Sequence, residues 1–294
     1  MYTIWVAGST HRTTQVAETI LADKRFLITH IITPQPRKVG RKQELVTNPL
    51  ANFAEKNKIA TTLVDQKIDQ QIKTRLTNLE KPDLIMVVDF GFWVPTWLLN
   101  WPKKAPLNIH PSLLPRWRGS SPGQSVLLQG EPESAVTLMQ IIEQMDAGPI
   151  LTQLPFKVEP TWNQADYYQF SFDLICERLT DYLADFMIGK ITPQPQPAES
   201  PTPLANKISK DQAFVAWKDL GLAMQAGQQA VELERACRAY NPWPKLWTKV
   251  QTTKGEKRLI IHHCSVVNHK LVLNQVQLEG KNPTNWQEVK NQLI

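Results

Sequence analysis

Short apolar runs alternate with helical patterns along the first 190 residues of the chain. The apolar runs, which indicate strands, cover residues 3–7, 27–32, 61–64, 84–88, 107–109 and 135–141. The helical patterns cover residues 13–22, 49–58, 67–79 and 162–188. Alternation of this kind predicts an α/β fold, a doubly wound, mostly parallel sheet with helices on both faces. In such sheets, ligands bind at the carboxyl ends of the strands.

A proline-rich segment follows this alternation. Residues 191–203 contain five prolines, and such a run favours an extended conformation and cannot continue a helix or a central strand. We therefore expect a linker over residues 191–205, between an N-terminal domain of residues 1–190 and a C-terminal domain of residues 206–294. The C-terminal part carries one helical pattern and several short apolar runs, at residues 233–240, 247–250, 258–263, 265–267 and 271–276. This arrangement predicts a small β-barrel similar to the oligonucleotide-binding (OB) fold.

The positive charge of the chain is concentrated in its C-terminal third. Residues 206–294 contain 13 Lys or Arg and 7 Asp or Glu, whereas the preceding 205 residues contain 20 of each. A basic small domain next to a neutral large one indicates a polyanionic partner such as nucleic acid. A solvated basic surface without a partner is the alternative that charge alone leaves open.

Several classes of protein do not fit this sequence. It has no run of about 18 consecutive apolar residues, so we expect no membrane span. Its first residues carry neither the basic nor the long apolar part of a signal peptide. Cys176, Cys237 and Cys264 lie far apart and form no CxxC pair, which argues against disulfides and a structural zinc site. These features predict a cytoplasmic protein.

The common nucleotide and metal motifs are also missing. The first strand is followed by a single glycine, Gly8, where a dinucleotide site requires three at fixed spacing, and there is no P-loop. His262 and His263 are adjacent, so on a strand their side chains point to opposite faces and cannot share one metal ion. We therefore expect no metal.

Three polar residues remain as candidates for catalysis. Asn108 and His110 are two positions apart at the end of an apolar run, so on a strand they share one face. Asp146 lies in a sharp turn beside Gly148. An amide can donate a hydrogen bond to an oxyanion, and a histidine can accept a proton from an attacking amine. A carboxylate near the histidine stabilises its protonated form. The alternative from spacing alone is a structural histidine and a turn aspartate.

Two longer segments give these residues a context. Residues 107–119 read LNIHPSLLPRWRG, and residues 137–140, TLMQ, lead into MDAGPI at residues 145–150. Both resemble signatures of the folate-dependent formyltransferase family. The resemblance implies a Rossmann-like domain that binds 10-formyltetrahydrofolate, with Asn108 and His110 acting on the formyl group and Asp146 supporting His110. The folate contacts implied by the family are Val88, Asp89, Phe90, Gly91, Ser112, Leu113, Leu114, Pro115, Ile142, Gln144 and Asp146.

Three further segments are similar to the branch of this family that formylates methionyl-tRNA. They are PRKVGRK at residues 36–42, NKISKD at 206–211 followed by Trp217, and ERACRAYNPWP at 234–244. The resemblance implies initiator methionyl-tRNA as the partner, the C-terminal domain as its binding domain, and a monomeric enzyme. The implied tRNA contacts are Arg37, Lys38, Arg41, Lys42, Lys207 and Lys210. Basic side chains of this kind bind phosphate and make affinity depend on salt.

The sequence also departs from the family. After the first strand, members usually have Gly-Thr-Pro or Gly-Ser-Pro and then a Phe-Ala pair, whereas residues 8–13 read GSTHRT here. The family's Ala-Tyr-Gly is Asp89-Phe90-Gly91 in this chain. The altered first turn bears on how the neighbouring pocket holds the methionyl group.

Alternatives also stay open: transfer to a nucleotide amino sugar or glycinamide ribonucleotide, hydrolysis of formyltetrahydrofolate, or a tRNA-binding module without catalysis.

Overall fold

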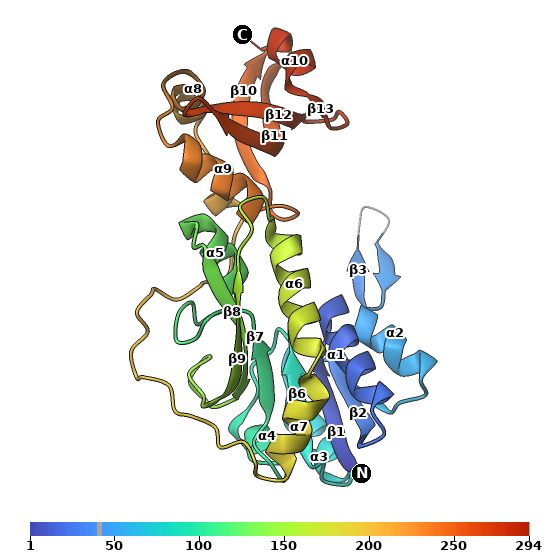
Figure 1. Ribbon diagram of the computed structural model, residues 1–294. Helices are drawn as coiled ribbons and strands as arrows, with labels where there is room; N and C mark the ends of the chain where they lie inside the picture. Colours follow the sequence, from blue (N-terminus) through green and yellow to red (C-terminus); the bar gives the residue numbers. More distant parts are fainter. Residues whose placement is uncertain (40–42, 294) are drawn as a thin grey trace. The chain divides into compact units, whose positions relative to one another are not determined.

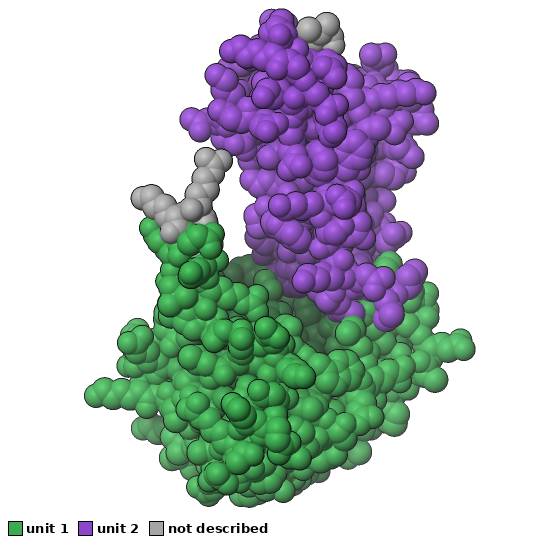
Figure 2. Space-filling view, turned by 180° about the vertical axis from the view of Figure 1, so that it is seen from behind, with its two compact units in different colours: residues 1–118, 135–155, 169–202 green, residues 119–134, 156–168, 203–294 purple. Residues whose placement is uncertain are grey.

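The computed structural model describes residues 1–39 and 43–293. The chain forms two compact units (Figure 2). Unit 1 contains residues 1–118, 135–155 and 169–202, and unit 2 contains residues 119–134, 156–168 and 203–294. Domain boundaries at residues 190 and 206 remain a prediction. Two of the predicted tRNA contacts, Arg41 and Lys42, lie outside the described residues, and so does Gly40.

A seven-stranded sheet forms the centre of unit 1, in the order β5-β2-β1-β6-β7-β8-β9 (Figure 1). Its strands are β1 (Tyr2–Gly8), β2 (Phe26–Pro34), β5 (Thr61–Val64), β6 (Leu84–Val88), β7 (Leu107–His110), β8 (Glu133–Gln140) and β9 (Ile150–Lys157). Its helices are α1 (His11–Ala22), α2 (Pro49–Lys56), α3 (Gln70–Thr77), α4 (Thr96–Leu99), α6 (Gln164–Cys176), which continues from unit 2, and α7 (Leu179–Met187). A two-stranded hairpin, β3 (Arg37–Val39) with β4 (Glu44–Val46), stands apart from the sheet.

The strands from β5 to β7 run parallel, and β8 is antiparallel to β7. The predicted doubly wound, mostly parallel sheet is therefore confirmed. Alternate residues of the central strands face opposite sides: Trp5 and Ala7 join a cluster with α3 and α4, while α1 and α7 pack together on the other side (Figure 1). Val16 and Ile20 of α1 are fully buried there, at the spacing expected for one helix face.

Two details of unit 1 differ from the sequence prediction. The long helical pattern of residues 162–188 is two helices, because Arg178 leaves the helical conformation at φ −130° and ψ 9°. Strand β9 was not predicted. Its residues are mostly half-exposed, so the sequence lacks the strong apolar alternation that identifies a strand.

Unit 2 contains a four-stranded antiparallel sheet in the order β10-β11-β12-β13. The strands are β10 (Leu246–Thr252), β11 (Gly255–Val267), β12 (Lys270–Leu278) and β13 (Thr284–Asn285). The helices are α5 (Pro122–Gln129), α8 (Trp217–Ala226), α9 (Ala230–Ala239) and α10 (Trp286–Val289), with short 3-10 turns at Asp211–Ala213 and Lys290–Gln292. The small β domain predicted to follow the α/β domain is thus confirmed, and its strands are antiparallel.

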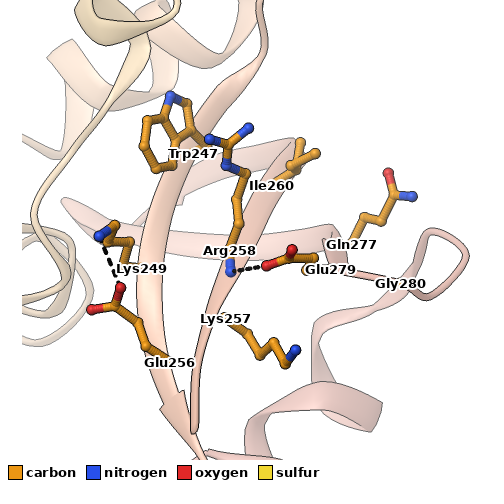
Figure 3. Close-up of a pocket in the computed structure, with 9 residues that line it drawn as sticks. All are labelled: Trp247, Lys249, Glu256, Lys257, Arg258, Ile260, Gln277, Glu279 and Gly280. Carbon is orange, nitrogen blue, oxygen red and sulfur yellow. Dashed lines mark hydrogen bonds and ion pairs between the residues drawn. The ribbon is translucent and has the colours of Figure 1, made fainter. Parts of the chain in front are cut away.

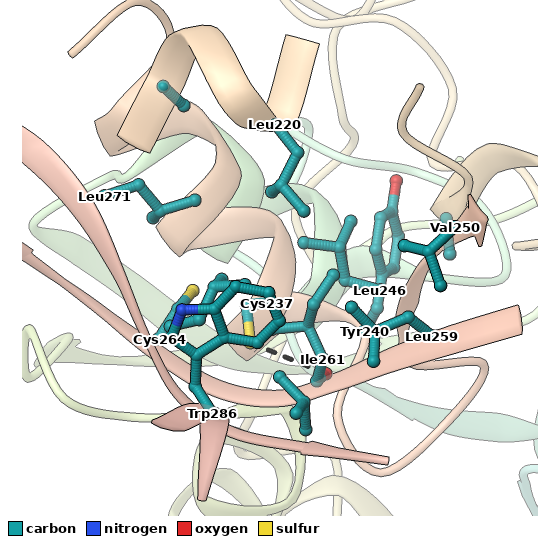
Figure 4. Close-up of a cluster of buried hydrophobic side chains, with 14 of the residues drawn as sticks. Leu220, Cys237, Tyr240, Leu246, Val250, Leu259, Ile261, Cys264, Leu271 and Trp286 are labelled. Atoms are coloured by element: carbon teal, nitrogen blue, oxygen red, sulfur yellow. Dashed lines mark hydrogen bonds between the residues drawn. The ribbon is translucent and has the colours of Figure 1, made fainter. Parts of the chain in front are cut away.

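The core of unit 2 lies between this sheet and its helices (Figure 4). Leu259, Ile261 and Cys264 of β11 are buried in it, together with Leu220 of α8 and Cys237 of α9. The spacing of three between Ile261 and Cys264 reflects bulges in the pairing of β11 with β12. The two strands predicted at residues 258–263 and 265–267 are therefore one strand with an interruption. None of the described helices combines the length and apolar character needed to cross a membrane.

Candidate active site

Strand β7 places Asn108 and His110 in the middle of the large sheet. Asn108 is paired on both sides, with Val87 of β6 and Met139 of β8, and His110 is paired with Thr137 of β8. Leu107 and Ile109 are buried at 0% and 3% exposure, which anchors the strand. Asn108 is half-exposed and His110 is buried. Strand alternation puts these two side chains on the same face, as the sequence predicted.

The imidazole of His110 has a defined partner on each nitrogen. Its Nε2 lies 3.0 Å from the carbonyl oxygen of Trp117, which can only accept a hydrogen bond. Nε2 therefore carries the proton in the neutral ring, and Nδ1 carries the lone pair. Asp146 lies on that side, with 3.6 Å between Nδ1 and Oδ2. The Asp146 carboxylate thus faces the ring nitrogen of His110 that carries the lone pair.

A tight turn between β8 and β9 supplies Asp146. Its backbone has a φ of 49°, a left-handed conformation that aspartate adopts more readily than most residues. Gly148 follows at a point where a Cβ atom would lie 1.9 Å from the carbonyl oxygen of Gln140. The turn closes through the amide of Gln140, which donates to the carbonyl of Pro149 at 2.8 Å. Only glycine at position 148 allows this close approach.

Residues 88–91, the first segment predicted to contact folate, leave the carboxyl end of β6. Val88 and Phe90 are buried, and Phe90 packs into the same cluster as Ile141, at the start of the Asp146 turn. Asp89 and Gly91 have positive φ values of 48° and 76° and are exposed. The structure therefore packs Phe90 and Ile141 into one cluster and leaves Asp89 and Gly91 exposed.

The unusual first turn and the unusual Asp89 are bonded to each other. The Asp89 carboxylate accepts from the hydroxyl of Thr10 at 2.8 Å and from Nε of Arg12 at 2.7 Å. The hydroxyl of Ser9 donates to the Asp89 carbonyl at 3.1 Å. Both departures from the family pattern thus belong to one polar network at the carboxyl ends of β1 and β6. Nothing in the sequence links residues so far apart.

The other predicted folate residues fall into two groups. Ser112 and Leu114 are buried, and the Ser112 hydroxyl donates to the carbonyl of Arg116 at 2.7 Å, so their side chains hold the loop that Pro115 continues. The second group is exposed and includes Leu113 at 37% and Ile142 at 41%. Gln144 is also exposed. Exposed apolar side chains in loops around a buried histidine are typical of a ligand site.

The described residues predicted to contact tRNA lie in two places. Arg37 and Lys38 are exposed on β3 of the unit 1 hairpin. Lys207 and Lys210 are exposed in unit 2, before α8. The carbonyl of Lys210 accepts from Nε1 of Trp247 at 2.8 Å, which holds this segment against β10.

A groove on the sheet of unit 2 was not predicted from the sequence. It has a volume of about 470 Å³, and Figure 3 shows the nine residues that line it. The guanidinium of Arg258 lies 4.1 Å from the ring centroid of Trp247, a cation–π contact. Lys249 and Lys257 add two cations, against the carboxylates of Glu256 and Glu279. The sequence offered one signal for this groove, the adjacent cations Lys257 and Arg258. Which side of the sheet each side chain lies on became clear only from the structure of the strand.

The sequence matches known proteins over most of its length. The profile of the family described as formyl transferase matches residues 3–174. A methionyl-tRNA formyltransferase from Wolbachia pipientis is 32% identical over 86% of this chain and 84% of its own length. The chain belongs to the formyl transferase family.

Other members extend the comparison. A methionyl-tRNA formyltransferase from Pseudoalteromonas translucida is 28% identical, over 90% of this chain and 85% of its own. Among solved structures, an N-formyltransferase from Helicobacter canadensis, in complex with folinic acid and dTDP-3-aminofucose, has a TM-score of 0.62 at 17% identity. The match covers 91% of this formyltransferase and 89% of that chain, and it shows a shared fold.

Proposed function

We propose that this formyltransferase transfers the formyl group of 10-formyltetrahydrofolate to the α-amine of methionyl initiator tRNA, in the cytoplasm and as a monomer. The choice of this acceptor is supported by the similarity in sequence to methionyl-tRNA formyltransferases, at 28% and 32% identity over most of both chains. The basic residues of unit 2 support it independently, because tRNA is a polyanion.

The site residues have distinct tasks in this reaction. The folate carrier supplies an activated formyl group on a nitrogen that can leave. When the acceptor amine bonds to the formyl carbon, the Asn108 amide donates a hydrogen bond to the developing oxyanion, which is typically worth about 100- to 1000-fold in rate. His110 accepts the amine proton at Nδ1 and passes it to the leaving nitrogen. Asp146, 3.6 Å from Nδ1, stabilises the charged ring between these two steps.

The loops around the site fit a folate carrier. A pterin has a flat ring with polar edges, so it requires apolar surface and backbone hydrogen-bonding groups. Leu113, Ile142 and Met145 offer exposed apolar side chains in the two loops that contain the predicted contacts. The exposed residues Asp89 and Gly91 offer polar groups beside them.

The groove in unit 2 supports a nucleic-acid acceptor. Its three cations exceed its two carboxylates: Lys249 and Glu256 pair at 2.8 Å, which leaves Lys257 and Arg258 against Glu279. The Arg258–Trp247 pair presents a flat cationic surface of the kind that contacts phosphates and bases. Lys207 and Lys210 add exposed charge to the same unit.

A polar acceptor such as a nucleotide amino sugar is the second candidate. The Arg12–Asp89 pair and Thr10 form a polar network at the carboxyl ends of β1 and β6, where the family pattern has proline and aromatic residues. A methionyl side chain gains little from such groups, whereas a sugar can bond to them. The observation that favours this second candidate is therefore the hydrogen-bonding capacity of this network.

A competition assay distinguishes the acceptors. We expect the purified protein, given 10-formyltetrahydrofolate, to formylate charged initiator tRNA in preference to a nucleotide amino sugar and glycinamide ribonucleotide. Preferential formylation of the sugar or the ribonucleotide would reject the proposed acceptor. Formate release at the same rate without any acceptor would indicate a hydrolase instead.

Substitutions in the site test the assigned chemistry. We expect Asn108→Ala to reduce kcat by about 100- to 1000-fold and His110→Ala by about 100- to 10,000-fold. The affinity for tRNA should stay close to that of the unmodified protein, because neither side chain lies in the basic surfaces. Near-normal turnover by His110→Ala would rule out His110 as the proton acceptor.

A further inference from the structure

The side chain of Gln196, in the proline-rich segment, binds the turn that carries Asp146. Its Nε2 lies 3.0 Å from the carbonyl oxygen of Asp146 and 2.7 Å from that of Gly148. An amide nitrogen has two hydrogens, and carbonyl oxygens only accept, so each hydrogen serves one carbonyl. Gln196 thereby donates hydrogen bonds to the turn on both sides of Ala147.

A buried arginine holds Gln196 from its other end. Arg118 is 3% exposed, and its Nε and Nη2 lie 3.1 and 2.9 Å from Oε1 of Gln196. The same guanidinium donates to the carbonyls of Pro197 at 2.7 Å and Ala198 at 3.1 Å. Because a guanidinium only donates, the amide of Gln196 has one possible orientation, with Oε1 toward Arg118 and Nε2 toward the turn.

The rest of the segment is fastened to the other side of the site. The hydroxyl of Ser200 donates to the carbonyl of Pro115 at 2.7 Å, and the amide of Trp117 donates to the hydroxyl of Thr202 at 2.7 Å. Trp117 is the residue whose carbonyl binds His110. We call residues 194–202 the strap, since they join the segment that holds His110 to the turn that holds Asp146.

We infer that Gln196 is a positioning residue for formyl transfer, which sets the distance of the Asp146 carboxylate from His110 through the backbone of the turn. Asp146 has a positive φ and needs external contacts to keep that conformation. The hydrogen bonds to its carbonyl and to that of Gly148 are such contacts. Without them, the carboxylate moves relative to Nδ1 and the imidazolium loses its counter-charge.

This inference rests on the proposed function for one of its two readouts, the rate of transfer. We expect Gln196→Ala to reduce kcat by about ten- to a hundred-fold, as small displacements of catalytic groups do, with little change in KM for folate. Gln194→Ala is the matched control, because Gln194 is an exposed strap residue whose side chain donates to the carbonyl of Thr192 at 3.0 Å, in the same proline-rich segment. It should keep the turnover of the unmodified protein.

A second variant separates positioning from docking of the strap. Gln196→Glu keeps an acceptor for Arg118, so the strap stays in place, but it removes both hydrogens that reach the turn. We expect it to lower kcat as much as Gln196→Ala does. Turnover by Gln196→Glu within two-fold of the unmodified protein would overturn the inference.

A double-variant cycle tests whether Gln196 acts through Asp146. In an Asp146→Asn background, Gln196→Ala should cause little further loss of kcat, because the carboxylate it positions is already absent. A full additional ten-fold loss in that background would mean that the strap acts by another route, and would overturn the inference.

A readout without activity separates this inference from the proposed function. The side-chain ¹⁵N–¹H spectrum of the His110 ring at one fixed pH reports on the environment of Nδ1. We expect Gln196→Ala to shift it toward the spectrum of Asp146→Asn, while Gln194→Ala leaves it unchanged. An unchanged His110 spectrum in Gln196→Ala would reject the positioning role even if no acceptor were ever formylated.

Discussion

At the scale of single residues, His30 gives unit 1 a pH-dependent stability. It is 4% exposed, its Nε2 lies 2.8 Å from the hydroxyl of Thr62, and its ring lies 5.2 Å from that of Trp5. Burial, reinforced by the charge of Arg75, lowers the pKa of His30 from 6.5 to about 4. Between these two values, the unfolded chain binds a proton that the folded chain does not. The free energy of unfolding therefore decreases as the pH falls from 6.5 to about 4, by up to about 3 kcal/mol at ~1.4 kcal/mol per pKa unit.

The variant His30→Gln tests this dependence. Glutamine can bond to Thr62 but does not titrate, so urea unfolding at pH 7, 6, 5 and 4.5 should show a flatter profile than the unmodified protein. His11→Gln, at an exposed position, should keep the original profile. An equally steep decrease in His30→Gln would assign the acid sensitivity to other groups.

The residues of the site differ in how far the sequence could predict them. Asn108 and His110 follow from strand alternation, which depends only on neighbouring residues. Gln196 lies 50 residues from Asp146 and sits in a segment without periodicity, so its contact with the turn has no local signal. The partner of His110 is the carbonyl of Trp117, and every residue has a carbonyl, so residue type carried no information about it.

At the scale of elements, the turn between β8 and β9 depends on Gly148. In Gly148→Ala, the new Cβ would lie 1.9 Å from the backbone oxygen of Gln140, so the turn must shift. We expect the free energy of unfolding to decrease by about 1–3 kcal/mol. Turnover should also decrease, because Asp146 moves with the turn. Gly221→Ala is the matched control, in the interior of α8 with open space around it, and should raise stability by up to about 1 kcal/mol. Chemical denaturation of both variants measures the contrast, and similar values for the two would refute the steric argument.

Strands were predicted well where most of their residues are buried, and poorly where the buried face is interrupted or the residues are exposed. The strands β1 and β6 are short and largely buried, so their apolar runs identified them. In β11, the bulges near His263 shift the buried face by one residue, and a period of two cannot continue through such a shift. Arg37 and Lys38 of β3 and the three residues of β4 are exposed, so no buried apolar face identifies these strands in the sequence.

At the scale of the whole molecule, the uneven charge is the feature with the widest consequence. The net charge of +6 lies entirely within residues 206–294. Those residues belong to unit 2, where part of the charge gathers in the groove around Arg258. A polyanionic acceptor bound there releases counterions, so its affinity must decrease with salt in proportion to the number of phosphates contacted.

Replacing both Lys257 and Arg258 by alanine tests that consequence. We expect KM for charged tRNA to rise, and the slope of log KM against log salt to decrease by about one unit for each lost phosphate contact. KM for the folate substrate should not change, since the predicted folate residues all belong to unit 1. Lys270→Ala removes a charge from an exposed position in the same unit, outside the groove, and should leave the salt slope unaltered. If the double variant kept the original slope, the groove would have no phosphate contact, and the tRNA would have to bind through the remaining basic residues.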